Sequence, residues 1–106
     1  MFFPNVSAIV KACTKDKDFA LEKLEFVSVD GNGYIEDTIC GLDFKISPRS
    51  FYQVNKDCAE MLYEKAIELL SPQDGENIAD LFCGTGTMGL IVASRSKSNV
   101  FGVEIE

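Results

Sequence analysis

The stretch Ile78-Ala79-Asp80-Leu81-Phe82-Cys83-Gly84-Thr85-Gly86-Thr87-Met88-Gly89 decides the fold of this chain, together with Gly102-Val103-Glu104 further on. The spacing predicts a strand over 77–82, a glycine loop, a helix over about 87–94 and a second strand over 100–105. Glycines allow a tight turn and a close approach of backbone to a ligand, and the helix start offers unpaired N–H groups. The acid that ends the second strand is placed to accept ribose hydroxyls. The pattern predicts a β-α-β unit with a nucleotide-cofactor pocket.

The residues before this unit predict strands and one helix. Four strands are expected, over 6–13, 24–30, 34–39 and 42–46, and Asp30-Gly31-Asn32-Gly33 is typical of a hairpin turn. A helix is expected from about 54 to 70, with Asn55 as its N-cap. Its apolar side chains recur at helical spacing and are expected to pack on a sheet: Ala59, Leu62, Tyr63, Ala66, Leu69 and Leu70.

The expected fold class is therefore α/β, or α+β for so short a chain. A small antiparallel β-meander over 1–46 precedes a helix and the first β-α-β unit of a Rossmann-like domain over 47–106.

Composition restricts the classes of function. The chain has 106 residues and a net charge of −7, so a nucleic-acid footprint is not expected on this piece itself; Lys45 with Arg49 is the local basic hint. It has no histidine, and its four cysteines lie far apart, so no metal site is expected. Reduced thiols and the lack of a long apolar run indicate a cytoplasmic protein without a membrane segment.

The choice of cofactor depends on Asp80. A carboxylate four residues before the first glycine would repel a pyrophosphate, but it suits the ammonium group of S-adenosylmethionine. Three alternatives stay open at this point: a methyltransferase, a fragment of an NAD-binding Rossmann oxidoreductase, and a non-catalytic interaction module in which Asp80 and Glu104 are ordinary acids. Cys83 lies in the loop without a nearby base and is interpreted as a small, partly buried side chain.

Several segments together resemble the RNA (uracil-5-)-methyltransferase family, whose members modify uridines in tRNA or rRNA. They are Phe44-Lys45-Ile46-Ser47-Pro48-Arg49-Ser50-Phe51-Tyr52-Gln53-Val54-Asn55, the run Asp80-Leu81-Phe82-Cys83-Gly84-Thr85-Gly86-Thr87, and Gly102-Val103-Glu104-Ile105. The resemblance is good over about 34–106. It implies S-adenosylmethionine as cofactor, bound by Gln53, Asp80, Phe82, Gly84, Gly86, Thr87 and Glu104.

The resemblance also implies what this chain lacks. In the family a cysteine attacks C6 of uracil, the methyl group moves to C5, and a base then removes the C5 proton from a flipped nucleotide. None of the four cysteines here matches that cysteine, so no catalytic residue is assigned. The chain is expected to be the cofactor half of a longer enzyme, inactive alone, and to self-associate as a dimer through its uncovered sheet. RNA is the partner expected for the intact parent.

Overall fold

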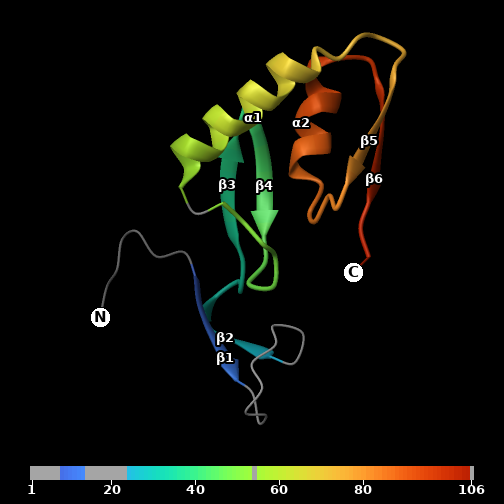
Figure 1. Ribbon diagram of the computed structural model, residues 1–106. Coiled ribbons are helices and arrows are strands. Elements are labelled where there is room, and N and C mark those ends of the chain that lie inside the picture. Colours follow the sequence, from blue (N-terminus) through green and yellow to red (C-terminus); the bar gives the residue numbers. More distant parts are fainter. Residues whose placement is uncertain (1–7, 14–23, 54, 106) are drawn as a thin grey trace. The chain divides into compact units, whose positions relative to one another are not determined.

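The computed structural model describes residues 8–13, 24–53 and 55–105 (Figure 1). The elements follow one another as β1 (Ala8–Cys13), β2 (Glu25–Gly31), β3 (Ile35–Ile39), β4 (Leu42–Ile46), α1 (Lys56–Leu70), β5 (Asn77–Leu81), α2 (Thr87–Arg95) and β6 (Asn99–Val103). The strands form three two-stranded sheets, β1–β2, β3–β4 and β5–β6. The expected α/β fold class, with antiparallel strands followed by a β-α-β unit, is confirmed.

The chain divides into two compact units. The first contains Met1–Asp37 and Asp43–Ser50, and the second contains Thr38–Leu42 and Phe51–Glu106. The predicted boundary between residues 46 and 47 stays a prediction for the domains of the longer protein. Among the described residues, no helix has the length and apolar character needed to cross a bilayer.

In the first unit, β1 and β2 run antiparallel, in a register from Ala8 opposite Gly31 to Cys13 opposite Glu25. The sequence predicted that a turn at 30–33 joins two paired strands, and this prediction is wrong. Gly31 and Gly33 have positive φ angles of 73° and 75°, as in a turn. However, β2 stays paired with β1 up to Gly31, and β3 belongs to a different sheet. The expected meander is therefore two separate strand pairs.

The turn between β3 and β4 consists of Cys40 and Gly41, whose φ angles are 49° and 81°. Two successive positive φ angles are the mark of the tight hairpin turns that fit twisted strands. Figure 1 shows the two strands running in opposite directions. The tip of this hairpin belongs to the second unit, where Ile39 is fully buried.

Helix α1 begins where the sequence indicated. Asn55 is its N-cap, and the Asn55 Oδ1 atom accepts a hydrogen bond of 3.1 Å from the Cys58 backbone N–H. The predicted first residue, Val54, lies outside the described residues. Ser71 ends the helix in the left-handed region, and its N–H donates to the Ile67 carbonyl.

The apolar face predicted for α1 is only partly correct. Ala59 is buried, but Leu62, Leu69 and Leu70 are 56%, 76% and 48% exposed. Instead of lying on a sheet, α1 contacts α2 and the tip of the β3–β4 hairpin, to which Glu60 and Glu64 contribute polar contacts. The packed face is therefore rotated from the one that leucine spacing predicted.

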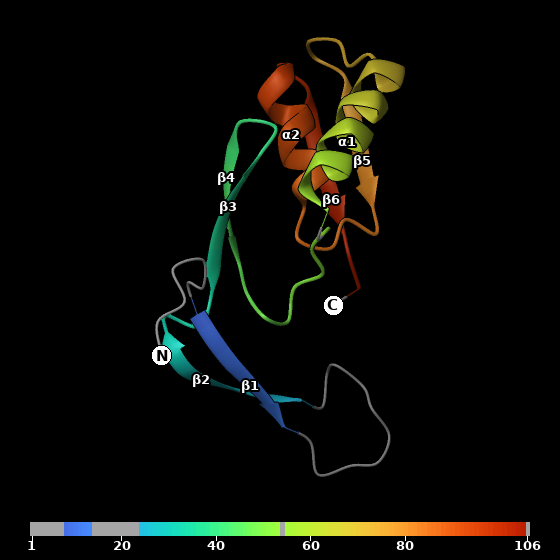
Figure 2. The same ribbon diagram turned by 90° about the vertical axis from the view of Figure 1, so that its left-hand side faces the viewer.

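Strands β5 and β6 are parallel and are joined through α2, which lies beside them in both views (Figures 1 and 2). Ile91 and Val92 of α2 are almost completely buried and supply much of the core of this unit. The opposite sheet face is open to solvent, because Leu81 and Val103 are paired in register and both are more than half exposed.

Candidate functional site

The loop between β5 and α2 has an unusual backbone. Phe82, Gly84 and Gly86 all have positive φ angles, of 59°, 55° and 77°. A hydrogen bond of 2.8 Å from the Gly86 N–H to the Cys83 carbonyl closes the turn. Gly86 is the N-cap of α2 and supplies no side chain for that role. Because a side chain at Gly84 or Gly86 would meet no protein atom within 4 Å, the loop faces open space.

Asp80 joins the strand to the start of the helix. The Gly89 backbone N–H, in the first turn of α2, donates to the Asp80 Oδ2 atom at 2.9 Å. A β-carbon on Gly89 would stand 3.0 Å from that oxygen and 3.2 Å from Val100 Cγ1, so only glycine fits without displacing them. Asp80 therefore caps α2 from outside the helix. Its predicted contact with a cofactor stays a prediction.

Glu104 follows β6 and reaches back to the loop. Its Oε2 atom accepts a hydrogen bond of 2.8 Å from the Gly84 N–H, and its Oε1 atom accepts one of 2.7 Å from the Ile105 N–H. The end of the second strand is thus tied to the first glycine, twenty residues earlier. Glu104 lies beside the glycine loop, as the sequence predicted. The hydrogen bond from the Gly84 N–H that holds it there could not be predicted from spacing.

The other predicted site residues come from two places. Phe82 is 88% exposed in the left-handed region, a strained conformation for a residue with a large side chain. Thr87 is the first residue of α2, and its hydroxyl lies 3.0 Å from that of Thr85. Gln53 lies in the segment between β4 and α1 and is half-buried. Six of the seven predicted site residues therefore lie at the loop or at the ends of the elements beside it. The seventh, Gln53, comes from another segment of the same unit.

Sequence reasoning assigned no role to Gly102, which packs against the loop. A β-carbon at Gly102 would lie 3.0 Å from the Cys83 sulfur. The Cys83 N–H also donates to the Val103 carbonyl at 3.1 Å, so the loop stays bonded to the end of β6. Cys83 is half-buried, in agreement with the interpretation that it fills space beside the loop.

This contact predicts a compensating pair of substitutions. Gly102→Ala is expected to lower the free energy of unfolding by about 1 kcal/mol, because the new methyl group meets the Cys83 sulfur. In Cys83→Ala/Gly102→Ala the obstructing sulfur is absent, and most of the lost stability is expected to return. Urea denaturation of the two single variants and the double variant measures this coupling. Strictly additive effects of the two substitutions would show that the contact has no energetic weight.

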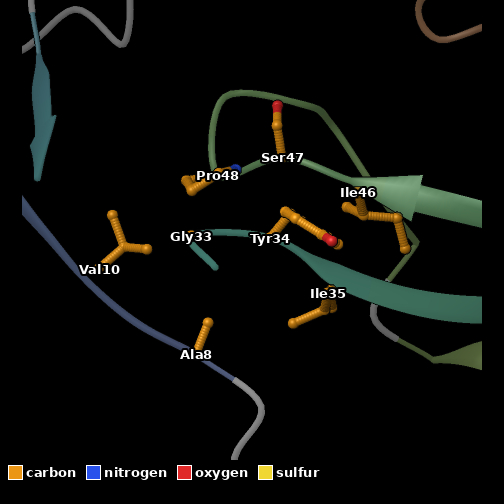
Figure 3. Close-up of a pocket in the computed structure, with 8 residues that line it drawn as sticks. All are labelled: Ala8, Val10, Gly33, Tyr34, Ile35, Ile46, Ser47 and Pro48. Atoms are coloured by element: carbon orange, nitrogen blue, oxygen red, sulfur yellow. The ribbon is translucent and has the colours of Figure 1, made fainter. Parts of the chain in front are cut away.

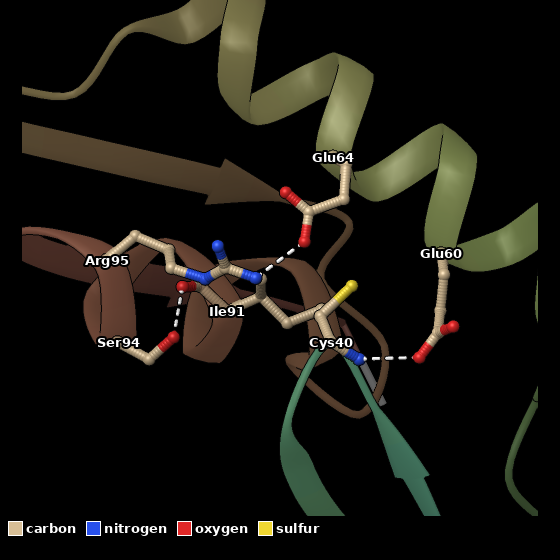
Figure 4. Close-up of polar contacts among 6 residues, drawn as sticks. All are labelled: Cys40, Glu60, Glu64, Ile91, Ser94 and Arg95. Atoms are coloured by element: carbon tan, nitrogen blue, oxygen red, sulfur yellow. Dashed lines mark hydrogen bonds and ion pairs between the residues drawn. The ribbon is translucent and has the colours of Figure 1, made fainter.

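Another set of polar contacts joins the hairpin tip to α1, and α1 to α2 (Figure 4). The Cys40 N–H donates to Glu60 Oε1 at 2.9 Å, and Glu64 of α1 forms an ion pair with Arg95 of α2. Burial, followed by the charges of Glu64 and Glu60, raises the pKa of the Cys40 thiol, and Arg95 opposes them. A thiol with a raised pKa is a poor nucleophile at neutral pH.

A parallel β-α-β unit with a glycine loop at the start of its helix, and an acid after the second strand, defines a class of nucleotide-cofactor-binding proteins. No protein-family model matches the chain. Relatives do. An uncharacterized RNA methyltransferase of Staphylococcus aureus (strain MSSA476) is 37% identical over 97% of the chain, and one of Streptococcus agalactiae serotype V is 38% identical over the same share.

A solved structure agrees with these relatives. The crystal structure of Pyrococcus abyssi tRNA (uracil-54, C5)-methyltransferase in complex with S-adenosyl-L-homocysteine matches 96% of the chain with a TM-score of 0.73 and 29% identity. Over nearly its whole length the chain is similar to RNA methyltransferases, and the resemblance found in the sequence is confirmed. It spans 22–23% of the length of the two bacterial relatives and 25% of the archaeal protein.

Proposed function

We propose that this chain is the methyl-donor-binding part of an enzyme that transfers a methyl group from S-adenosylmethionine to C5 of a uridine in tRNA or rRNA. The observation that carries the proposal is the structural match to a uracil-C5 methyltransferase with S-adenosylhomocysteine bound. The relatives are named as RNA methyltransferases, which favours this function over the NAD-dependent and non-catalytic alternatives. A cytoplasmic location is part of the same proposal.

The loop fits a nucleoside cofactor on geometric grounds. The open space above Gly84 and Gly86 lets a ligand approach the backbone closely, and Glu104 stands beside it. A carboxylate can accept about four hydrogen bonds, so Glu104 can hold the Gly84 and Ile105 N–H groups and still accept from a ribose hydroxyl. The exposed ring of Phe82 offers an apolar face next to the loop.

Each residue then has a specific task toward the bound cofactor. Glu104 orients the ribose, and Gly84 and Gly86 keep the backbone close to it. Asp80 fixes the start of α2 and presents negative charge to the ammonium group. Gln53, whose amide both donates and accepts, and Thr87 bind the amino-acid end. When bound, S-adenosylmethionine supplies the electrophilic methyl group. None of the four cysteines is assigned as the nucleophile, so the chain alone is proposed to be inactive.

An NMR titration of the ¹⁵N-labelled chain with S-adenosylhomocysteine tests the site at the level of residues. The largest amide shifts are expected at 82–87 and at 104–105, because the Gly84 and Ile105 N–H groups both donate to the acid that meets the ribose. Shifts confined to other segments, or spectra that do not change at saturating ligand, would contradict the assignment.

We also propose that the chain associates with a second copy of itself. Leu81 and Val103 on the open sheet face, and Leu62 and Leu69 on α1, are all more than half exposed. Exposed apolar side chains of this kind favour association. We expect a dimer by light scattering coupled to size-exclusion chromatography, with Val103→Lys shifting the chain toward monomer. A monomeric wild-type chain at high concentration would be the opposite result.

A further inference from the structure

The first unit contains a small groove away from the glycine loop (Figure 3). The side chains of Ala8 and Val10 rise from β1 on one side, opposite residues from the start of β3 and the end of β4. The cavity measures about 190 Å³ and is open to solvent on one side. Its lining is mostly apolar and comprises Ala8, Val10, Gly33, Tyr34, Ile35, Ile46, Ser47 and Pro48.

The size of the groove limits what it can accept. A water molecule occupies roughly 30 Å³ in the liquid, so the cavity is several waters in volume. Pockets that enclose whole drug-sized ligands measure roughly 300–1,000 Å³. The groove therefore suits one ring-sized group. Tyr34 contributes an aromatic residue to its wall, while the Ser47 hydroxyl lies 2.9 Å from that of Ser50.

Two cations flank the groove-lining run 46–48 in the sequence. The Lys45 ammonium lies 3.7 Å from the centroid of the Tyr34 ring, so it stands next to the groove wall. The Arg49 guanidinium lies 4.9 Å from the centroid of the Phe26 ring and donates to the Leu24 carbonyl at 2.8 Å. These partners are neutral, and both cations are exposed, so their positive charge is available to an anion outside.

An apolar groove with an aromatic residue in its wall and adjacent exposed cations matches the chemistry of a single-stranded polynucleotide, in which bases alternate with phosphates. We propose that this groove holds one unpaired base of the RNA substrate, with Lys45 and Arg49 contacting the phosphates on either side. The inference rests on the proposed function, because it takes RNA as the substrate. It assigns an RNA contact to a chain whose net charge of −7 gave no such expectation.

Photocrosslinking of the chain to a short single-stranded oligouridylate that contains 4-thiouridine tests the groove. Crosslinks mapped by mass spectrometry are expected at Tyr34 and within 45–49. Lys45→Gln is expected to weaken binding several-fold and to reduce the slope of log affinity against log salt by about 0.7, the value for one phosphate contact on a single strand. Lys65→Gln is the matched control, because Lys65 pairs with Glu68 on the exposed face of α1.

Four results would overturn the inference: crosslinks only in 51–105, no binding of the oligouridylate, unchanged affinity in Lys45→Gln, or displacement of the RNA by an equal concentration of oligoglutamate. The last would assign the groove to an acidic peptide. Circular dichroism confirms that Lys45→Gln is folded. Titration with S-adenosylhomocysteine is the independent readout for the proposed function. If the chain binds S-adenosylhomocysteine but fails the RNA test, only the assignment of the groove is rejected. If it binds RNA in the groove but not S-adenosylhomocysteine, the assignment of the cofactor site is rejected.

Discussion

Replacing Glu104 with glutamine is expected to weaken the binding of S-adenosylhomocysteine by roughly tenfold to a hundredfold. Glutamine keeps one oxygen, which can still accept from the Gly84 N–H, but its amide nitrogen can accept neither from the Ile105 N–H nor from a ribose hydroxyl. A hydrogen bond to a charged group contributes about 1.5–3 kcal/mol, which corresponds to that range of affinity. Titration calorimetry of the wild-type chain and the variant measures the difference directly.

The control for this experiment is Glu68→Gln. It makes the same chemical change on the exposed face of α1, where Glu68 pairs with Lys65, and is expected to leave the affinity unchanged. Glu104→Ala is expected to bind more weakly than Glu104→Gln, because the loop then also loses its tie to β6. Wild-type affinity in Glu104→Gln would remove this residue from the cofactor site.

Replacing Asp80 with alanine is expected to lower the free energy of unfolding by about 1–2 kcal/mol, the usual effect of losing a helix cap. The Gly89 N–H would lose its acceptor at a position where the helix itself supplies none. Asp80→Asn is the matched variant, because an amide oxygen can take over the same hydrogen bond. It is expected to stay within a few tenths of a kcal/mol of wild type in urea denaturation.

The asparagine variant also separates the two roles of Asp80. If the carboxylate contacts the ammonium group of the methyl donor, Asp80→Asn keeps its stability but binds S-adenosylhomocysteine less tightly. If Asp80 only caps α2, both the stability and the affinity are retained. An Asp80→Ala chain as stable as wild type would show that the hydrogen bond to Gly89 carries no weight.

Local signals in the sequence predicted much of this structure. Asn55 as a cap, the strand before the loop and the helix after it depend on neighbouring residues, and the structure places them within one or two residues of the expected bounds. The spacing of the glycines was sufficient to predict the turn between β5 and α2. These features are encoded within a turn or two of chain.

Features that depend on distant partners could not be predicted. The turn at 30–33 has suitable glycines, but whether β2 pairs forward with β3 or back with β1 depends on packing far along the chain. The leucines of α1 indicated one buried face, while Glu60 and Glu64 contact Cys40 and Arg95, which are distant in the sequence. The tie between Glu104 and Gly84 likewise joins residues that are remote in sequence.

The most direct test of the cofactor site is a comparison of two ligands by titration calorimetry. The wild-type chain is titrated with S-adenosylhomocysteine and, separately, with NADH under the same conditions. Because Asp80 places negative charge behind the start of α2 and Glu104 faces the loop, saturable binding is expected for S-adenosylhomocysteine and none for NADH. Binding of NADH in preference to S-adenosylhomocysteine, or of neither ligand, would contradict the assignment of this loop as a methyl-donor site.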